Sequence, residues 1–473
     1  MTARSKVDQA RLARTLRQHG QEHVLRWVGD LDEAGRNRLL GQLAELDLNQ
    51  LDRLAVLIET PPTDVGFGDV APAPIERLPL NEAAQQAERQ VAQIGREAIQ
   101  ADRVALVTAA GGQGTRLRYD HPKGMYPITP IRRVSLFQLF AEEILAARRR
   151  YGARLPWLIM TSPTNDAQTR RFFEESEHFG LGADSMHFFV QQANPILGED
   201  GRLLLADKDQ LLMGPDGHGG TFAALERSGL LDLLRGEGWD LISYFQVDNP
   251  LVTVVDQRFI GHHLRRGADF SCKVVPKRDP LEALGMAVLK GDRPAVIEYV
   301  DVPEEVAGAR LPAGGLRFPY GSIAVHVMDV PFVERVLQRA DGLPWHVARK
   351  QYEVIDEQGQ KVPSPSGGCY KFERFIFDAL AFAEECAFVE VRRDTEFAPV
   401  KALEGADTPD TARRLLQRRW LQWLQAAGAD VRMPMDLSAP VVEISPLYAQ
   451  DAVELEKRLR PGWAHSFPLL LEP

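Results

Sequence analysis

Short apolar runs alternate with amphipathic segments through the middle of the chain, from residue 103 to about residue 395. The short runs are typical of buried strands, and the segments with apolar residues at helical spacing are typical of helices. The predicted strands are 104–108, 155–161, 186–191, 241–247, 270–275, 295–300 and 321–327, and the predicted helices lie near 136–150, 165–176, 220–234 and 372–386. This alternation predicts an α/β fold with a mixed, mostly parallel sheet, in which ligands bind beyond the carboxyl ends of the strands.

The two ends of the chain have different patterns. Leucines at helical spacing within residues 7–58 predict an amphipathic helical arm whose leucines serve packing, and Pro61 and Pro62 predict a linker before a helix at about 81–99. Thr408-Pro409-Asp410 has the form of a helix start, and the segment 433–447 is rich in proline. We therefore predict three parts: an N-terminal helical region 1–99, a catalytic domain 100–400 and a small C-terminal domain 401–473.

Composition narrows the class of protein. The 473 residues, 44% of them hydrophobic, can bury a large core, and no stretch approaches the roughly 18–20 apolar residues of a membrane span. The first residues lack the apolar centre of a secretory signal, so we expect a cytoplasmic protein without a membrane partner. A net charge of −10 argues against a nucleic-acid partner. Cys272, Cys369 and Cys386 are too few and too far apart for a zinc site or a disulfide framework, and the sequence indicates no oligomeric state.

A glycine turn follows the predicted strand 104–108. Gly111, Gly112 and Gly114 offer backbone N–H groups that a polyphosphate can approach, and Arg116 and Lys123 add positive charge. The string G-x-x-x-x-G-K-[ST] of a P-loop does not occur, and Leu117 stands where a dinucleotide fingerprint needs its third glycine. The segment therefore predicts a triphosphate site of another kind.

Asp248 follows the apolar strand 241–247 in the string Val247-Asp248-Asn249. A carboxylate at the end of such a strand, facing phosphates, is an oxygen ligand suited to Mg²⁺. Asp-Asn is also a frequent turn sequence, so the pair could simply close the strand. The two roles are compatible.

The string G-G-x-G-T-R-L at 111–117, followed by P-K-G-M at 122–125, is similar to the signature of the UDP-sugar pyrophosphorylases, especially the eukaryotic-type UDP-N-acetylglucosamine pyrophosphorylases. Further matching blocks keep their order along the chain: 157–162, 214–220, 247–249, 273–275, 284–285, 296–299, 321–323, 372–378, 396–401 and 444–447. The resemblance implies a Rossmann-like nucleotidyltransferase fold. It also implies formation of a UDP-sugar and pyrophosphate from UTP and a sugar 1-phosphate, by direct in-line displacement with Mg²⁺ or Mn²⁺ at Asp248.

The resemblance also implies roles for residues on the phosphate side. The triphosphate contacts Gly111, Gly112, Gly114 and Thr115. Arg116 stabilises the leaving pyrophosphate, Lys123 neutralises charge on the transferred phosphoryl group, and Lys401 approaches the phosphates from the far side.

Uracil and sugar positions follow from the same resemblance. Gln191, with Gln192 as its rival, and the backbone of Gly217 match uracil-binding positions. Gly285, Glu298 and Tyr299 match sugar-binding positions, and His218 and Ser322 occupy further positions expected to read the sugar.

The sequence departs from the family at three positions. His218 and Ser322 replace asparagines of the enzymes for acetamido sugars, and Arg118 replaces a usual glycine. From the resemblance as a whole we expect UDP-N-acetylhexosamine formation. Because of these departures, UDP-glucose or UDP-galactose formation is the alternative. A non-catalytic nucleotide-sugar binding protein is a more distant alternative, because all four predicted catalytic residues, Arg116, Lys123, Asp248 and Lys401, are present.

Overall fold

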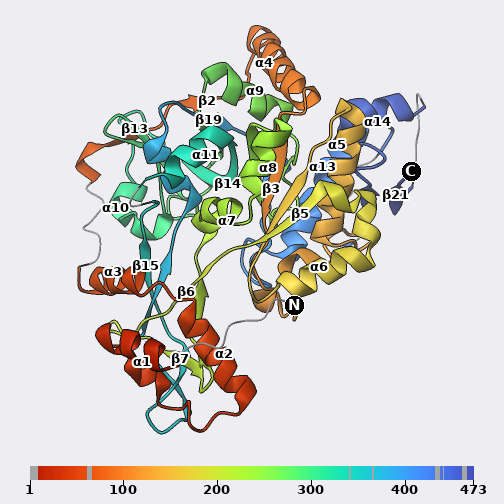
Figure 1. Ribbon diagram of the computed structural model, residues 1–473. Coiled ribbons are helices and arrows are strands. Elements are labelled where there is room, and N and C mark those ends of the chain that lie inside the picture. The colour runs from red at the N-terminus through yellow and green to blue at the C-terminus, as the bar shows by residue number, and fades with distance from the viewer. Residues whose placement is uncertain are drawn as a thin grey trace. The chain divides into compact units, whose positions relative to one another are not determined.

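The computed structural model describes residues 9–60, 67–339, 342–364, 367–431, 437–439, 441–460 and 466–473 (Figure 1). Contacts divide the chain into two compact units: the first comprises residues 1–65, 192–220 and 343–376, and the second comprises 66–191, 221–342 and 377–473. Pro61 and Pro62 of the predicted linker lie outside the described residues. The predicted ranges 1–99, 100–400 and 401–473 do not coincide with these units and stay a prediction about domains.

The second unit is built on a large mixed sheet. Its main path runs in the order β2 (Ile75–Glu76), β19 (Cys386–Glu390), β11 (Phe270–Pro276), β14 (Tyr320–Asp329), β10 (Leu241–Gln246), β3 (Val104–Ala109), β4 (Trp157–Thr161) and β5 (Met186–Val190). Along this path every neighbouring pair is parallel except the two pairs made by β14. Three more strands extend the sheet beside β14 with antiparallel pairing: β12 (Met286–Lys290), β13 (Arg293–Ile297) and β1 (Val70–Pro72). The predicted mixed α/β sheet is confirmed.

Alternate residues of a strand point to opposite faces of the sheet, so apolar side chains on each face must be covered. Helices provide this cover. One large hydrophobic cluster joins Leu106 of β3 and Phe245 of β10 to side chains of several helices. These helices are α4 (Glu82–Gln100), α5 (Leu136–Tyr151), α6 (Asp166–Glu175), α9 (Gln257–Arg266) and α13 (Pro409–Ala426). Helices α4 and α9 touch backbone to backbone: a Cβ on Gly261 would lie 1.9 Å from the carbonyl oxygen of Val91, so only glycine fits there. A second group, α7 (Thr221–Arg227), α8 (Leu230–Glu237) and α11 (Val330–Leu337), packs together.

Side-chain caps explain where several helices begin. Ser135 accepts the N–H of Gln138 at the start of α5, and Asn81 accepts the N–H of Ala84 at the start of α4. Thr408 caps α13 in the same way, with Pro409 at the first helical position, as the sequence predicted. Along the described ranges, no helix combines the length and the apolar character required to cross a bilayer.

The first unit contains the N-terminal helices α1 (Gln9–Gln18), α2 (Glu33–Ala44) and α3 (Leu48–Glu59). Several of their leucines, among them Leu39 and Leu54, are fully buried in a cluster with Leu197 and Phe372, and Leu12 and Leu57 pack against it partly buried. The unit also holds four two-stranded sheets: β6 (Ala193–Pro195) with β9 (Met213–Pro215), β7 (Leu205–Asp207) with β8 (Gln210–Leu211), β15 (His346–Lys350) with β18 (Cys369–Glu373), and β16 (Glu353–Ile355) with β17 (Lys361–Pro363). The packing role predicted for the leucines is confirmed.

Some predicted elements differ from the structure. The predicted helix over 372–386 is wrong: β18 ends at Glu373, a 3-10 helix spans Ile376–Phe382, and β19 begins at Cys386. Phe372 and Glu373 pair with β15 and Cys386 pairs with β11, so strand pairing at both ends of the range overrides the helical spacing of the apolar residues. The predicted helix 220–234 is interrupted at Gly229, whose φ of 73° is a left-handed conformation. The predicted strand 295–300 ends at Ile297.

Candidate active site

Four adjacent parallel strands end at one edge of the sheet. Ala109 of β3 pairs with Gln246 of β10 and with Met160 of β4, and Thr161 of β4 pairs with Val190 of β5. The segments that follow therefore begin side by side. They carry the Gly111 turn after β3, Asp248 after β10 and Gln191 after β5. This is the carboxyl edge at which α/β sheets bind ligands.

Hydrogen bonds from neighbouring residues to its carbonyl oxygens fix the glycine turn. Asn165 donates from Nδ2 to the carbonyl oxygen of Ala110 at 2.9 Å, and the N–H of Lys123 donates to the carbonyl oxygen of Gly112 at 3.1 Å. Within the described chain, the N–H groups of Gly111 and Gly112 donate to no protein acceptor. Two amides in this turn are thus available to an anion.

Gly114 has a different place in the turn. Its N–H donates to the carbonyl oxygen of His121 at 3.0 Å, and a Cβ at this position would lie 2.7 Å from the carbonyl oxygen of Tyr119. The amide is therefore already bonded within the protein. The glycine is required because two backbone segments pass close to it.

The residue predicted to read uracil lies against the turn. A Cβ on Gly111 would approach Nε2 of Gln191 to 2.5 Å, so a larger residue there would displace the amide end of Gln191. The side chain of Gln191 is buried, whereas Gln192, the alternative candidate for uracil binding, is exposed. Gln191 is the glutamine that the structure places beside the phosphate turn.

Lys123 and Asp248 form an ion pair, although 125 positions separate them in the sequence. Nζ of Lys123 lies 3.3 Å from Oδ2 of Asp248, and the two side chains are 18% and 14% exposed. Lys123 begins a 3-10 helix, Lys123–Met125, and its neighbour Gly124 packs against the ring of Phe137. The structure thus joins a cation of the glycine loop to the carboxylate at the end of β10.

Lys401 is brought near by its backbone, and its side chain has another partner. The N–H of Val400 donates to the carbonyl oxygen of Asp248 at 2.8 Å, which fixes the preceding residue beside the end of β10. Nζ of Lys401 lies 3.3 Å from Oδ2 of Asp407, and its side chain is 41% exposed. A phosphate would have to compete with Asp407 for this ammonium group.

Thr115, Arg116 and Arg118 are exposed on the loop after the turn. Arg116 makes no ion pair within the part of the chain that the structure describes, so its guanidinium is available to a ligand. Arg118 has φ 50° and ψ 44° at the end of the 3-10 helix Thr115–Leu117. This left-handed conformation explains why glycine suits the position and why an arginine there is strained.

Three of the predicted sugar-binding residues lie together. The N–H of Ser322, on β14, donates to the carbonyl oxygen of Gly285 at 2.8 Å. A Cβ on Gly285 would lie 3.6 Å from Oε2 of Glu298. Ser322 is 8% exposed, whereas Tyr299, in the 3-10 helix Tyr299–Asp301, is 42% exposed. A serine, a glutamate and a glycine backbone thus form a small polar group at this place.

Gly217 and His218 belong to the first compact unit. Gly217 has a φ of 80°, and a Cβ there would lie 2.4 Å from the carbonyl oxygen of Arg374. The ring of His218 stacks on Phe375 with centroids 5.3 Å apart, and its Nδ1 accepts the N–H of Ile376 at 3.0 Å. Burial, with a smaller contribution from His346, lowers the pKa of His218 to about 4. The imidazole is therefore neutral at pH 7, with its proton on Nε2.

Sequence reasoning missed several residues that hold the site together. Asn165 orients the glycine turn, and Asn249 bonds to the segment that carries Lys401. For Asn249 the sequence indicates only a role in a turn. Its partners, Glu396 and Ala398, lie 147 and 149 positions away, so no local pattern could have identified them.

Asp248 is the residue that could hold a metal ion. No group of three or more histidine, cysteine, aspartate or glutamate side chains in the described ranges is arranged to hold one. Mg²⁺ is commonly bound by one or two carboxylates together with substrate phosphates. A single, mostly buried carboxylate close to the open amides of the glycine turn fits that pattern.

Comparisons with known proteins agree with this geometry. Residues 69–451 match the family described as UTP–glucose-1-phosphate uridylyltransferase. The chain is 34% identical to UDP-N-acetylhexosamine pyrophosphorylase-like protein 1 of Xenopus tropicalis, over 97% of this chain and 96% of that protein, and 32% identical to UDP-N-acetylglucosamine diphosphorylase 2 of Arabidopsis thaliana, over 96% and 92%. Its fold is similar to the crystal structure of the UDP-N-acetylglucosamine pyrophosphorylase of Trypanosoma brucei in complex with inhibitor, with a TM-score of 0.81, 27% identity and 99% of each chain covered. The chain therefore belongs to the UTP–glucose-1-phosphate uridylyltransferase family, whose members are UDP-sugar pyrophosphorylases.

Proposed function

We propose that the protein is a uridylyltransferase that forms UDP-N-acetylhexosamine and pyrophosphate from UTP and an N-acetylhexosamine 1-phosphate. The observation that carries the proposal is the Lys123–Asp248 ion pair beside the open amides of Gly111 and Gly112. A cation, a carboxylate and backbone donors at the end of a parallel sheet are what a triphosphate with a bound divalent ion requires. The names of the relatives support the choice of sugar.

The chemistry follows from these groups. An oxygen of the sugar phosphate attacks the α-phosphorus of UTP, the bond from that phosphorus to the β-phosphate oxygen breaks, and pyrophosphate leaves. The amides of Gly111 and Gly112 hold the triphosphate, and Arg116 stabilises the pyrophosphate as it departs. Lys123 neutralises the charge that grows at the α-phosphate, and Lys401 leaves Asp407 to join it. No side chain is needed as a nucleophile, because positioning two anions is the main task.

Asp248 would hold the divalent cation, Mg²⁺ or Mn²⁺. When bound, the cation supplies positive charge to the phosphate oxygens of UTP. Lys123 would then share Asp248 with the metal ion, so the ion pair would keep the carboxylate oriented before substrates arrive.

Formation of UDP-glucose is the second candidate, and UDP-galactose formation uses the same chemistry. One observation favours it: His218 and Ser322 stand where the enzymes for acetamido sugars carry asparagine, and Ser322 lies next to Gly285 and Glu298. A serine hydroxyl reaches less far than an asparagine amide. The loss of one hydrogen bond to the acetamido group would weaken discrimination against glucose 1-phosphate.

Pyrophosphate release tests both candidates. The purified protein is incubated with UTP, Mg²⁺ and one of N-acetylglucosamine, N-acetylgalactosamine, glucose or galactose 1-phosphate. We expect release only when UTP, a sugar 1-phosphate and the cation are all present, with the highest kcat/KM for an N-acetylhexosamine 1-phosphate. A uridylylated protein formed from UTP alone would refute direct displacement, and no release with any sugar phosphate would favour the binding-protein alternative.

A further inference from the structure

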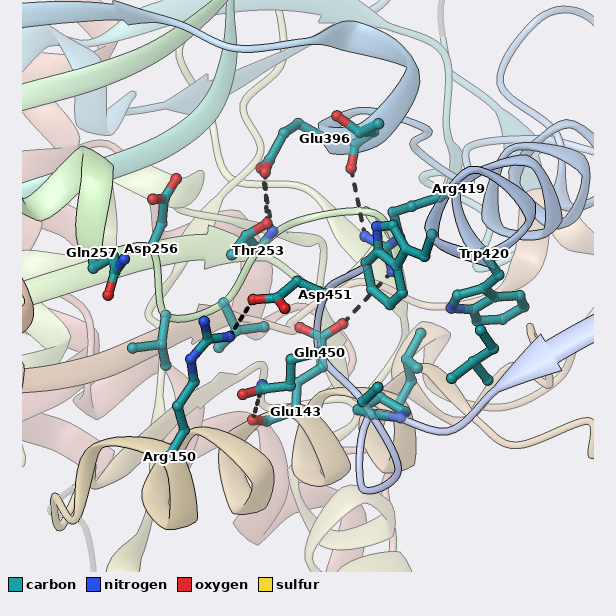
Figure 2. A pocket seen from close by; sticks show the side chains of 18 of the residues that line it. Glu143, Arg150, Thr253, Asp256, Gln257, Glu396, Arg419, Trp420, Gln450 and Asp451 are labelled. Carbon is teal, nitrogen blue, oxygen red and sulfur yellow. Dashed lines mark hydrogen bonds and ion pairs between the residues drawn. The ribbon is translucent and has the colours of Figure 1, made fainter. Parts of the chain in front are cut away.

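Glu396 connects the segment that carries Lys401 to the loop that follows β10. It is the last residue of α12 (Arg393–Glu396) and stands five positions before Lys401. Its carboxylate accepts the hydroxyl of Thr253 at 2.6 Å and the N–H of Thr253 at 3.2 Å. Figure 2 shows Glu396 and Thr253 facing each other across this loop. One carboxylate thus binds both a main-chain and a side-chain donor of the loop.

Asn249 makes the second connection between the same two segments. Its Nδ2 donates to the carbonyl oxygen of Glu396 at 2.8 Å, and its Oδ1 accepts the N–H of Ala398 at 3.0 Å. Asn249 is 3% exposed, so these bonds are shielded from water. Together with the bond from Val400 to the carbonyl oxygen of Asp248, they tie residues 396–400 to residues 248–253.

A buried lysine pairs with Glu396. Lys273, on β11, is 0% exposed, and its Nζ lies 2.9 Å from Oε2 of Glu396 and 2.6 Å from Oδ2 of Asp256. Burial alone would lower the pKa of Lys273, but the two carboxylates outweigh burial and raise it. Removal of one partner from a buried ion group is costly, so the three side chains hold one another in place.

Glu396 borders a cavity on one side. The residue lines a cavity of about 330 Å³, together with Glu143, Arg419 and Trp420 (Figure 2). Its position depends on its polar bonds to Thr253, Asn249 and Lys273.

We propose that Glu396 is a positioning residue for uridylyl transfer: bonded to Lys273, Thr253 and Asn249, it holds the segment that carries Lys401 in register with Asp248. This inference rests on the catalytic roles proposed for Asp248 and Lys401. Loss of the register would move Lys401 away from the α-phosphate without removing any group that touches a substrate. A misplacement of about 1 Å can lower a rate by roughly 10²-fold.

A double-mutant cycle on the full-length protein tests the proposal. The variants are Glu396→Gln, Lys401→Ala and the two combined, and kcat, KM for UTP and the melting temperature are measured for each. We expect Glu396→Gln to lower kcat by roughly 10- to 100-fold while KM changes by less than about threefold. In the Lys401→Ala background, Glu396→Gln should lower kcat by less than about threefold, because the residue that it positions is already gone.

Two further variants separate positioning from folding. Asn249→Asp keeps the acceptor for Ala398 and loses the donor to Glu396, so it should repeat the loss of kcat if Glu396→Gln fails to fold. Glu443→Gln is the control: Glu443 is a fully buried carboxylate bonded to Arg132, and we expect this variant to lower the melting temperature with kcat unchanged.

The outcomes are distinguishable. A full kcat in Lys401→Ala would overturn the proposed role of Lys401, and with it this inference. A loss of kcat in Lys401→Ala with an unchanged Glu396→Gln, or equal losses from Glu396→Gln in both backgrounds, would overturn the inference alone.

Discussion

The phosphate side and the sugar side of the candidate active site are built differently. On the phosphate side, charged groups and backbone amides are fixed by bonds between segments far apart in the chain, such as Lys123 with Asp248 and Asn249 with Glu396. On the sugar side, Gly285, Glu298 and Ser322 form a small group in which one side chain, that of Ser322, differs from the family pattern. From this difference we infer that the phosphate side sets whether transfer occurs and that the sugar side sets which sugar is used.

The largest expected effect comes from the charged pair. Lys123→Ala or Asp248→Asn should each lower kcat/KM by roughly 10²–10³-fold, because each removes one preorganised group that stabilises charge in the transition state. The measurement is pyrophosphate release with either sugar phosphate, together with a thermal melt. Lys361→Ala is the control, since Lys361 pairs with Asp207 at 3.9 Å on an exposed surface and should change neither quantity. A folded Lys123→Ala protein that kept a tenth of the activity would remove that lysine from the transfer step.

The next largest effect is expected on stability, at the glycine turn, where backbone segments are crowded. Gly114→Ala places a Cβ 2.7 Å from the carbonyl oxygen of Tyr119 and 3.0 Å from that of His121, so it should lower the free energy of unfolding by about 1–3 kcal/mol. Gly112→Ala meets nothing within 4 Å and should change stability by less than about 0.5 kcal/mol. Urea denaturation of both variants makes the comparison. Equal stability losses would mean that the crowding around Gly114 does not constrain the turn.

A buried glutamate, Glu143, predicts that the free energy of unfolding depends on pH. Burial raises the pKa of Glu143 from 4.5 to about 8, although Arg419 opposes the rise, and Glu142, Glu396 and the backbone of Val254 also act on this group. The folded protein therefore holds a proton that the unfolded chain releases above its own pKa. This contribution to stability is complete below about pH 4.5 and is lost as pH rises through about 8.

Glu143→Gln provides the test of that effect. The free energy of unfolding of the wild type, measured by denaturant titration from pH 5 to pH 9, should fall more steeply with pH than that of the variant. Parallel curves for the two proteins would show that Glu143 is ionised in the folded state at neutral pH.

The smallest effect is expected on the sugar side. Ser322→Asn with His218→Asn should raise the ratio of kcat/KM for N-acetylglucosamine 1-phosphate over glucose 1-phosphate by roughly two- to tenfold, the value of one hydrogen bond of about 0.5–1.5 kcal/mol. Ser322→Ala is the matched control, because it removes the hydroxyl without adding an amide. A ratio that stays within about twofold in the double variant would assign sugar selection to other residues, such as Glu298 and Tyr299.

Local patterns predicted the parts of the fold that depend on local sequence. The apolar runs of β3 and β10 gave the strands, and Thr408-Pro409 gave the start of α13, since caps and burial patterns act over a few residues. The helix predicted over 372–386 was wrong because both ends of that range pair with other strands, Phe372 and Glu373 with β15 and Cys386 with β11. Helical spacing of apolar residues cannot reveal such pairing.

The same limit applies to the site. The family motif predicted Lys123 and Asp248 as catalytic residues, and the structure places them together. Lys273 lay in an apolar strand pattern and Glu396 in a short motif, and neither position shows by itself that the two side chains meet in a buried ion group. Residues that position others are recognised only when distant segments are seen in contact.

The central claim is that the phosphate side sets whether transfer occurs and the sugar side sets which sugar is used. Comparing kcat/KM for N-acetylglucosamine 1-phosphate and glucose 1-phosphate tests this division most directly. It is measured in the wild type, in Asp248→Asn and in the Ser322→Asn/His218→Asn variant. The division predicts that Asp248→Asn lowers both values by the same factor and leaves their ratio unchanged, while the double variant shifts the ratio and keeps most of the activity. A changed ratio in Asp248→Asn, or a double variant that loses activity on both sugars equally, would contradict it.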